Sequence, residues 1–547
     1  MQRRTLIKGM AAAIPSLWVA RAPGNGNFFG EQNFGESITD GPFQPTWDSL
    51  KQYNVPDWYR NAKFGIWAHW GPQCQPEYGD WYARRMYEEG NDGYKYHLEK
   101  YGHPSKFGFK DVINEWKAEH WNPEELLALY KNAGAKYFMA LANHHDNFDL
   151  YNSKYQPWNS VKLGPKKDII GGWAKAARQH GLKFGVSVHA SHAWTWYEPA
   201  QRSDKTGPMA GVSYDGKLTK KDGKGTWWNG FDPQDLYAQN HPLSARGNFQ
   251  AQWEWSDGAS VPSKAYCEKF FNRTIELINN YDPDVLYFDD NVLPLYPVSD
   301  VGLRIAAHLY NNSIKKRGSL QTVLNGKILN EEQRKCMVWD IERGQSNRLE
   351  PFVWQTDTCI GSWHYDRRIY DNRGYKSSKT VIQTLADIVS KNGNLMLSVP
   401  LRGDGTIDSQ EREIVEGIGQ WMKINGECIF DTRPWHIFGE GPAIEGAAPL
   451  NAQGFNEGAG KAFGDTDIRF TVKGNTLYCI IMAWPDNGKA VIKSLAAGNE
   501  LYRSAIQQVQ LLGSDASLSF TRNEKGLEVV LPEKKPGDNA YVLKIMS

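Results

Sequence analysis

Residues 284–290 read Asp284-Val285-Leu286-Tyr287-Phe288-Asp289-Asp290, and this stretch decides the fold. Its apolar run predicts a strand buried on both faces, and two carboxylates follow where the strand ends. Burying a carboxylate costs free energy unless the group is paired or functional. Because neighbours on a strand point to opposite faces, Asp289 and Asp290 are expected to face different layers. Either Asp289 is a catalytic nucleophile or base, or the pair caps a helix or binds an arginine.

The same pattern recurs from about residue 50 to 430, where short apolar runs alternate with helical segments. Such alternation is typical of βαβ units. In a (β/α)8 barrel the carboxyl ends of all the strands converge on one face, whereas an open doubly wound sheet binds at one switch point. Polar residues follow many of these runs, which favours the barrel: His69, Asn143, His144, His145, His189, Asn325, Asp340 and Asp357.

The domain organisation follows from a change of pattern near residue 430. We predict an α/β fold, a TIM-like barrel over residues 47–432, followed by a C-terminal β-sandwich over 433–547 with short alternating strands. A linker is expected over 23–46. A Trp-rich insertion at about 191–262 interrupts the barrel, and it is either a substrate-facing loop or a packed cover.

The first 22 residues are read as an export signal. Arg3-Arg4 precedes a short run of small apolar residues, and Ala20 and Ala22 form a cleavage pattern. This twin-arginine-like signal predicts a periplasmic or secreted protein. No stretch is long and apolar enough to predict a membrane span.

Composition narrows the function. The 63 Lys and Arg residues nearly balance the 62 Asp and Glu residues, which argues against nucleic-acid binding. Aromatic residues make up 13% of the chain, which favours carbohydrate binding by stacking on sugar rings, although large cores also need them. The six cysteines are scattered without zinc-ligand spacing, and a disulfide or two is possible. No Gly-rich phosphate loop follows the first predicted strand, so a dinucleotide cofactor is not expected.

Five histidines follow the predicted strands, and imidazoles there can bind a metal, relay protons or bind sugar hydroxyls. Metal-dependent barrel hydrolases place a His-x-His pair after the first strand, whereas this chain has His69-Trp70 there. The neighbouring His144 and His145 would diverge if their strand continued. Sugar binding is therefore favoured over a metal site at His69, His144, His145, His189 and His192.

A retaining glycosidase also needs a general acid/base about 5 Å from its nucleophile. The downstream candidates are Asp340, Glu342, Glu350 and Asp357. Glu342 is preferred, because it is expected just past a strand, in a loop that brings it over the sugar.

Taken in order, several segments resemble glycoside hydrolase family 29, the α-L-fucosidases, across residues 47–545. The segments that carry the resemblance are KFGIWAHWG (63–71), GDWY (79–82), KYFMALANHHDNFDL (136–150), GLKFGV (181–186), DVLYFD (284–289), NGNLML (392–397) and GDGTI (403–407).

The resemblance implies a retaining, exo-acting α-L-fucosidase that uses no metal or cofactor. Asp289 would be the nucleophile and Glu342 the general acid/base. The partner would be a fucosylated glycan. The residues implied to bind the sugar are His69, Trp81, His144, His145 and Trp363. His189 is added to them because it follows the third predicted strand, although it does not match the family pattern there.

The chain departs from the family pattern at three places: Asp290-Asn291 after the nucleophile, His189 after the third strand, and Asn325-Gly326-Lys327 where an arginine is often found. Activity on α-L-galactosides, a metal-dependent barrel hydrolase and a non-catalytic glycan-binding protein remain the alternatives.

Overall fold

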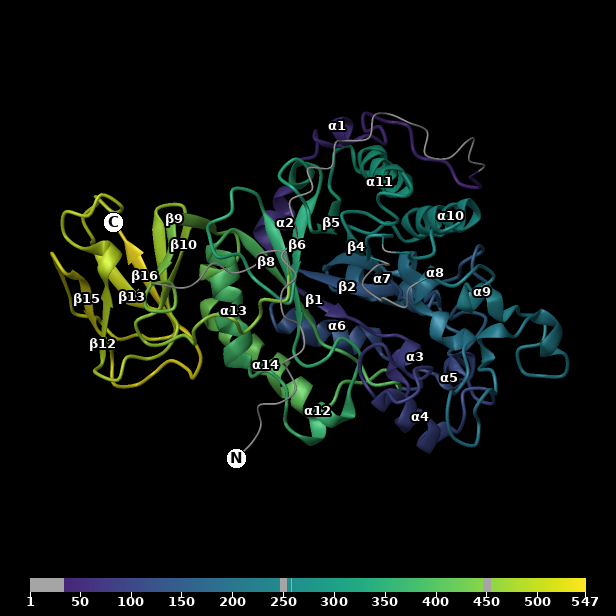
Figure 1. The fold of residues 1–547 in the computed structure, drawn as a ribbon. Helices are drawn as coiled ribbons and strands as arrows, with labels where there is room; N and C mark the ends of the chain where they lie inside the picture. Colours follow the sequence, from purple (N-terminus) through teal and green to yellow (C-terminus); the bar gives the residue numbers. More distant parts are fainter. Residues whose placement is uncertain (1–33, 246–252, 257, 446–453) are drawn as a thin grey trace.

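The computed structural model describes residues 34–245, 253–256, 258–445 and 454–547. Eight parallel strands close into a barrel in sequence order, as predicted (Figure 1). The expected export signal lies outside the described residues. The barrel strands are β1 (Phe64–Ala68), β2 (Tyr137–Asn143), β3 (Lys183–Val188), β4 (Val285–Asn291), β5 (Val323–Lys327), β6 (Val338–Glu342), β7 (Trp354–Cys359) and β8 (Gly393–Ser398).

The barrel strands are buried along nearly their whole length because helices cover them from outside, which explains their continuous apolar runs. Residues 328–337 and 343–353, which join β5 to β6 and β6 to β7, contain no α-helix. These two connections are short, so the helical layer is incomplete on that side. The covering helices are α6 (Pro123–Asn132), α7 (Ile169–Gln179), α10 (Lys264–Tyr281), α11 (Val301–Arg317), α13 (Ser378–Ser390) and α14 (Ser409–Asn425).

The end of β4 departs from regular pairing. The register between β4 and β5 shifts between Tyr287 and Asn291, so Asp289 lies within the irregularity. Irregular pairing of this kind redirects side chains, and it is common at barrel rims beside active sites.

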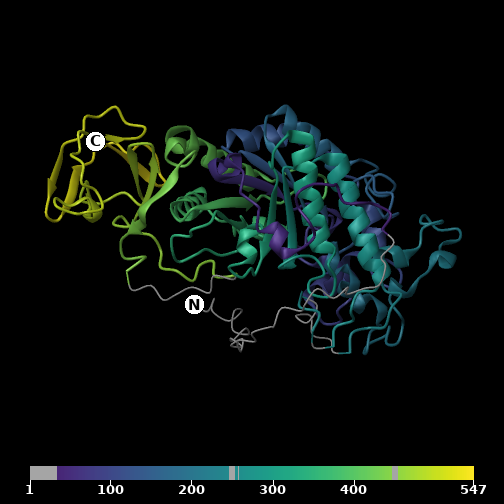
Figure 2. The same ribbon diagram turned by 90° about the horizontal axis from the view of Figure 1, so that it is seen from above.

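Short elements elaborate the carboxyl ends of the first and third strands. Segments α3 (Tyr82–Arg85), α4 (Asp92–Tyr101) and α5 (Phe109–Glu115) follow β1, and α8 (Ala193–Trp196) and α9 (Pro233–Tyr237) belong to the Trp-rich insertion. In both ribbon views the insertion forms the end of the molecule opposite the C-terminal strands (Figures 1 and 2).

Part of the insertion packs on itself, and part lies against the carboxyl face of the barrel. Trp194 stacks on His241 and Trp228 is buried, so these rings pack the insertion itself. Trp196 and Trp253 instead lie 5.8 and 5.5 Å, between ring centroids, from His145 at the carboxyl face of the barrel.

The C-terminal module is a β-sandwich, as predicted. Its strands form a five-stranded sheet in the order β13-β16-β11-β10-β9 and a three-stranded sheet in the order β12-β15-β14, around a separate apolar core. The strands are β9 (Arg433–Glu440), β10 (Ile468–Lys473), β11 (Thr476–Ile481), β12 (Lys489–Ile492), β13 (Gln508–Leu511), β14 (Phe520–Asn523), β15 (Gly526–Val530) and β16 (Tyr541–Met546).

The module packs firmly against the barrel. The buried Arg469 of β10 pairs with Asp387 of α13 at 2.5 Å, and the Trp421 indole of α14 donates to the Ala540 carbonyl at 2.7 Å. Buried ion pairs that cross an interface are costly to break, so the module buttresses this side of the barrel.

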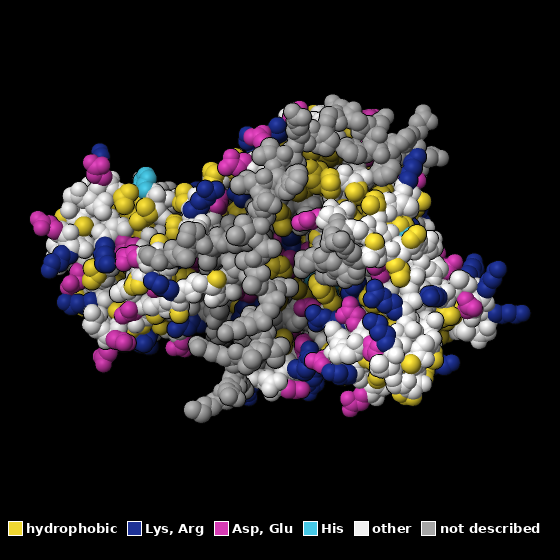
Figure 3. Space-filling model, viewed as in Figure 1, with side chains coloured by type: hydrophobic (Ala, Val, Ile, Leu, Met, Phe, Trp, Pro, Cys, Tyr) yellow, Lys and Arg dark blue, Asp and Glu magenta, His cyan; other side chains and the backbone are white. Residues whose placement is uncertain are grey.

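Three further expectations concern the whole chain. All six cysteines are buried and unpaired, so the suggested disulfides are absent. Among the described residues, no helix is both long and apolar enough to cross a bilayer. Positive and negative side chains are interspersed over the face in Figure 3, in line with the balanced composition.

Candidate active site

Asp289 lies at the centre of a buried cluster of positive and polar groups. Its Oδ2 lies 3.1 Å from His189 Nδ1 and 3.3 Å from His145 Nε2, and its Oδ1 accepts a hydrogen bond from Lys327 Nζ at 2.6 Å. A carboxylate with three such neighbours is held both ionised and fixed in orientation.

Lys327 joins Asp289 to Glu342. The same ammonium that binds Asp289 also donates a short hydrogen bond to Glu342 Oε2. Two carboxylate oxygens on one nitrogen lie no more than about 6 Å apart. That limit suits retaining glycosidases, whose carboxyl groups are about 5–5.5 Å apart, and falls below the wider spacing of inverting enzymes.

Glu342 occupies a different local structure from the one expected. It is the last residue of β6, whereas the sequence placed it in a loop past the strand. Because side chains alternate along a strand, Asp340 and Glu342 share the inward face of β6, and Glu342 is the one at the rim. The barrel itself therefore fixes this side chain.

The two carboxyl groups differ in their pKa values. Burial alone would raise the pKa of Asp289, but the Lys327 ammonium and hydrogen bonds from His145 and His189 hold it well below its usual range. Burial raises the pKa of Glu342 to about 7, with Lys327 opposing and the charge of Asp289 adding to the rise. Asp289 is thus ionised while Glu342 keeps its proton up to about pH 7, as an acid and nucleophile pair requires.

The other candidate carboxylates are placed less favourably. Asp289 and Glu342 keep 16% and 19% of their side-chain surface exposed, so a sugar can reach both. Asp340 and Asp357 are each 1% exposed inside the barrel. Glu350 is bound by Arg334, Arg348 and Ser346 away from Asp289.

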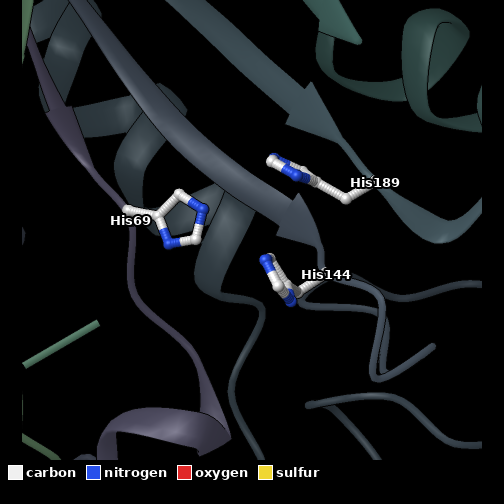
Figure 4. Close-up of side chains that lie close together, drawn as sticks. All are labelled: His69, His144 and His189. Carbon is white, nitrogen blue, oxygen red and sulfur yellow. The ribbon is translucent and has the colours of Figure 1, made fainter. Parts of the chain in front are cut away.

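Three histidine rings lie close together just after the ends of β1, β2 and β3 (Figure 4), and one of them, His189, contacts Asp289. The ring centroids of His69, His144 and His189 lie 5.0–5.3 Å apart. Burial and neighbouring imidazoles hold the pKa of His69 and of His144 well below the usual range. Burial lowers the pKa of His189 to about 4 despite Asp289. Neutral rings offer both donors and acceptors, which suits sugar hydroxyls.

His144 and His145 were expected to diverge only if their strand continued, and it does not. Strand β2 ends at Asn143, so the alternation of a strand stops before them, and their ring centroids lie 4.3 Å apart. His145 points to Asp289 while His144 joins the histidine cluster.

The same side chains include metal-ligand atoms. Ring nitrogens of His69, His144 and His189 lie within 4.8 Å of one another, as do ligand atoms of His145, His189 and Asp289. Either group could hold a divalent ion that accepts imidazole.

Asp290 points away from Asp289, as strand alternation predicts. Its Oδ1 accepts from the Ser191 hydroxyl at 2.6 Å and lies 2.9 Å from His192 Nε2. The His192 ring packs against Trp253 with centroids 3.8 Å apart. The second carboxylate thus ties the insertion to β4.

Of the two tryptophans implied to bind the sugar, Trp363 joins the cluster, 5.7 Å from His69 between ring centroids. Trp81 lies in the loop after β1, just before α3, and its backbone has a left-handed φ of 61°. The centroid of its ring lies 5.6 Å from the Arg85 guanidinium carbon.

Sequence reasoning missed several residues of this site. Lys327 was noted only as a departure from the family, although a cation at a strand end beside carboxylates is a signal of ion pairing. Gln73, Asp80 and His364 were not singled out, yet Gln73 bonds to His144 at 2.7 Å and His364 contacts both His69 and His144.

Replacing Lys327 is expected to shift the pH dependence of the reaction. A nucleophile works ionised and a general acid works protonated, so with Asp289 and Glu342 in these expected roles activity is expected to fall below the pKa of Asp289 and above that of Glu342. Lys327→Met removes a charge that lowers both pKa values. Both limbs of the kcat/KM profile are therefore expected to move to higher pH, measured with an aryl glycoside. Lys327→Arg keeps the charge and is the matched control, and unchanged limbs in Lys327→Met would contradict the assignment.

Comparisons with known proteins show the family to which the chain belongs. A family model described as Alpha-L-fucosidase matches residues 32–427, and one described as Alpha-L-fucosidase C-terminal domain matches 463–546. Tissue alpha-L-fucosidase of Rattus norvegicus is 24% identical, with 92% of each chain covered. Plasma alpha-L-fucosidase of Homo sapiens is 25% identical, covering 90% of this chain and 89% of its own.

Solved structures give the same result. The crystal structure of Thermotoga maritima alpha-fucosidase with a mechanism-based inhibitor superposes with a TM-score of 0.66 at 26% identity, covering 92% of this chain and all of the other. The complex of the Thermotoga maritima enzyme with fucose gives a TM-score of 0.65 at 26% identity and the same coverage. The chain therefore belongs to the alpha-L-fucosidase family, glycoside hydrolase family 29.

Proposed function

We propose that this protein hydrolyses terminal α-L-fucosyl residues of glycans with retention of anomeric configuration. The observation that carries the proposal is the pair of carboxyl groups, Asp289 and Glu342, bound to one ammonium at the carboxyl face of the barrel. Relatives and structural neighbours named as fucosidases supply the identity of the sugar.

In the first step a carboxylate oxygen of Asp289 attacks the anomeric carbon while the glycosidic C–O bond breaks. Glu342 gives its proton to the leaving oxygen, which departs as an alcohol. In the second step water attacks the anomeric carbon, Glu342 takes its proton, and the ester bond to Asp289 breaks. Free fucose is released and both carboxyl groups return to their initial state.

The change of role at Glu342 follows from the local charges. The negative charge of Asp289 helps to raise the pKa of Glu342. Ester formation removes that charge while Lys327 keeps its own. The pKa of Glu342 then falls, and the group becomes the base that the second step requires.

The neutral histidines and aromatic rings are proposed to hold the sugar. His69, His144 and His189 present ring nitrogens to its hydroxyls, and Trp67 and Trp363, 5.4 Å apart between centroids, offer apolar surface for its methyl group.

The test is proton NMR of the first product formed from an aryl α-L-fucoside. We expect α-L-fucose to appear before mutarotation, and β-L-fucose as the first product would overturn the mechanism. Two carboxyl groups suffice for this chemistry, so the rate is expected to be unchanged after dialysis against a chelator. A rate lost on chelation and recovered with a divalent ion would instead favour the metal-ligand reading of the histidines.

We also propose that the protein is exported through its twin-arginine-like segment. The support is Arg3-Arg4 ahead of a short apolar run and an Ala-x-Ala pattern. In a bacterial host, Arg3→Lys with Arg4→Lys is expected to keep the unprocessed chain in the cytoplasm. Normal processing and export of that variant would refute the proposal.

A further inference from the structure

His364 is a buried histidine to which the family pattern assigned no role. It lies between β7 and α12 (Arg367–Asp371) and is 1% exposed. Its ring packs edge-on against His69 and His144, with centroids 4.5 and 4.7 Å away. It therefore adds a fourth imidazole, from the segment after β7, to the three histidines drawn in Figure 4.

Asp80 fixes the orientation of this ring. Its Oδ1 lies 3.3 Å from His364 Nδ1 and accepts from the His364 backbone N–H at 2.7 Å, and its Oδ2 accepts from the Ser362 hydroxyl at 2.7 Å. Burial would raise the pKa of Asp80, but these hydrogen bonds lower it overall. A carboxylate oxygen accepts, so Nδ1 carries the proton, and in this tautomer of the imidazole Nε2 holds a lone pair.

That lone pair has no partner among the described residues. His364 Nε2 is buried without a hydrogen bond, and the same holds for His69 Nδ1 and His189 Nε2. Leaving a buried polar atom without a hydrogen bond costs free energy, so three such atoms in one cluster indicate a polar ligand rather than structural histidines.

The neighbouring His144 has the complementary polarity. The Gln73 amide oxygen accepts from the Ala83 backbone N–H at 3.4 Å, which turns the amide nitrogen toward His144 Nδ1 at 2.7 Å. His144 Nδ1 is then an acceptor and its proton is on Nε2. His144 thus offers a donor where His364 offers an acceptor, and a hydroxyl both donates and accepts.

Building on the proposed function, we propose that His364 is a further substrate-binding residue that accepts a hydrogen bond from one ring hydroxyl of the fucosyl unit. Asp80 is its positioning residue and holds the tautomer that accepts. A site that hydrogen-bonds a hydroxyl discriminates against a sugar lacking it, because its own polar group is then left unpaired.

The test is a cycle between the protein and the sugar. We would measure kcat/KM of wild type and His364→Ala on an aryl α-L-fucoside and on its 2-, 3- and 4-deoxy analogues. His364→Ala is expected to lose about 10-fold or more on the parent fucoside, and little or nothing on the one analogue that lacks the bound hydroxyl. Asp80→Ala is expected to show the same selectivity for that analogue.

His436→Ala, at an exposed position of β9, is the matched control and is expected to behave as wild type on every sugar. Circular dichroism of each variant checks that the fold is kept. Equal losses on all the deoxy sugars would mean a structural role and would overturn the proposal, as would no loss on the parent.

Binding separates this inference from the proposed function. Calorimetry with free L-fucose and its monodeoxy forms needs no turnover, and His364→Ala is expected to weaken all but one of these complexes about 10-fold. If the wild type bound fucose without hydrolysing a fucoside, the proposed function would be refuted. The inference about His364 would still hold if the variant weakened binding of all the sugars except one monodeoxy form. Binding unchanged in His364→Ala would refute the inference even with hydrolysis intact.

Discussion

Asp289→Ala is expected to lower kcat on an aryl α-L-fucoside by a factor on the order of 10⁴ or more, because it removes the carboxylate proposed to form the glycosyl ester. Lys327, His145 and His189 remain around the gap and form an anion site at its position. Added azide is therefore expected to restore turnover by attacking the anomeric carbon directly, giving the β-L-fucosyl azide. The measurement is the rate of aryl release, with NMR of the product.

Asp290→Asn is the matched control for this variant. It removes the neighbouring carboxylate, which contacts Ser191 and His192 rather than Lys327. Its loss is expected to be far smaller and not rescued by azide. If Asp290→Asn showed a large loss that azide restored, and Asp289→Ala showed little effect, the nucleophile would be Asp290. That result would contradict the geometry.

Glu342→Ala is expected to lose activity according to the leaving group. Substrates with poor leaving groups need the proton from Glu342 and are expected to lose about 10²–10⁴-fold. Activated aryl fucosides need it less, so they are expected to form the ester and then accumulate it. Azide would attack that ester and give the α-L-fucosyl azide, the anomer opposite to the product of Asp289→Ala.

The pH profile gives a second measurement on the same residue. Wild-type activity is expected to fall above about pH 7, where Glu342 loses its proton, and this limb is expected to vanish in Glu342→Ala. If the limb persists and the loss is equal for good and poor leaving groups, Glu342 is not the acid/base.

The barrel could be predicted from sequence because its strands are buried on both faces. Residues 284–288 read as a strand without any knowledge of their neighbours, and strand alternation placed Asp289 and Asp290 on different faces. The sandwich was equally accessible, since strands such as Ile468–Lys473 alternate between core and solvent. These inferences need only local periodicity.

What sequence could not supply depends on contacts between distant strands. Lys327 lies 38 residues after Asp289 and 15 residues before Glu342, and only barrel closure brings the three side chains together. The placement of Glu342 in a loop was wrong because β6 continues through it. The position of His364 beside His69 depends on its hydrogen bonds with Asp80, which precedes His364 by 284 residues in the sequence.

The covalent intermediate tests the central claim most directly. In a 2-deoxy-2-fluoro-α-L-fucosyl fluoride the 2-fluoro group slows both steps, but the fluoride leaving group makes ester formation faster than ester hydrolysis. The ester is therefore expected to accumulate and to label the protein with one fluorofucosyl group. Digestion and mass spectrometry are predicted to place that label on Asp289. A label on another carboxylate, or turnover without any labelled protein, would contradict the account.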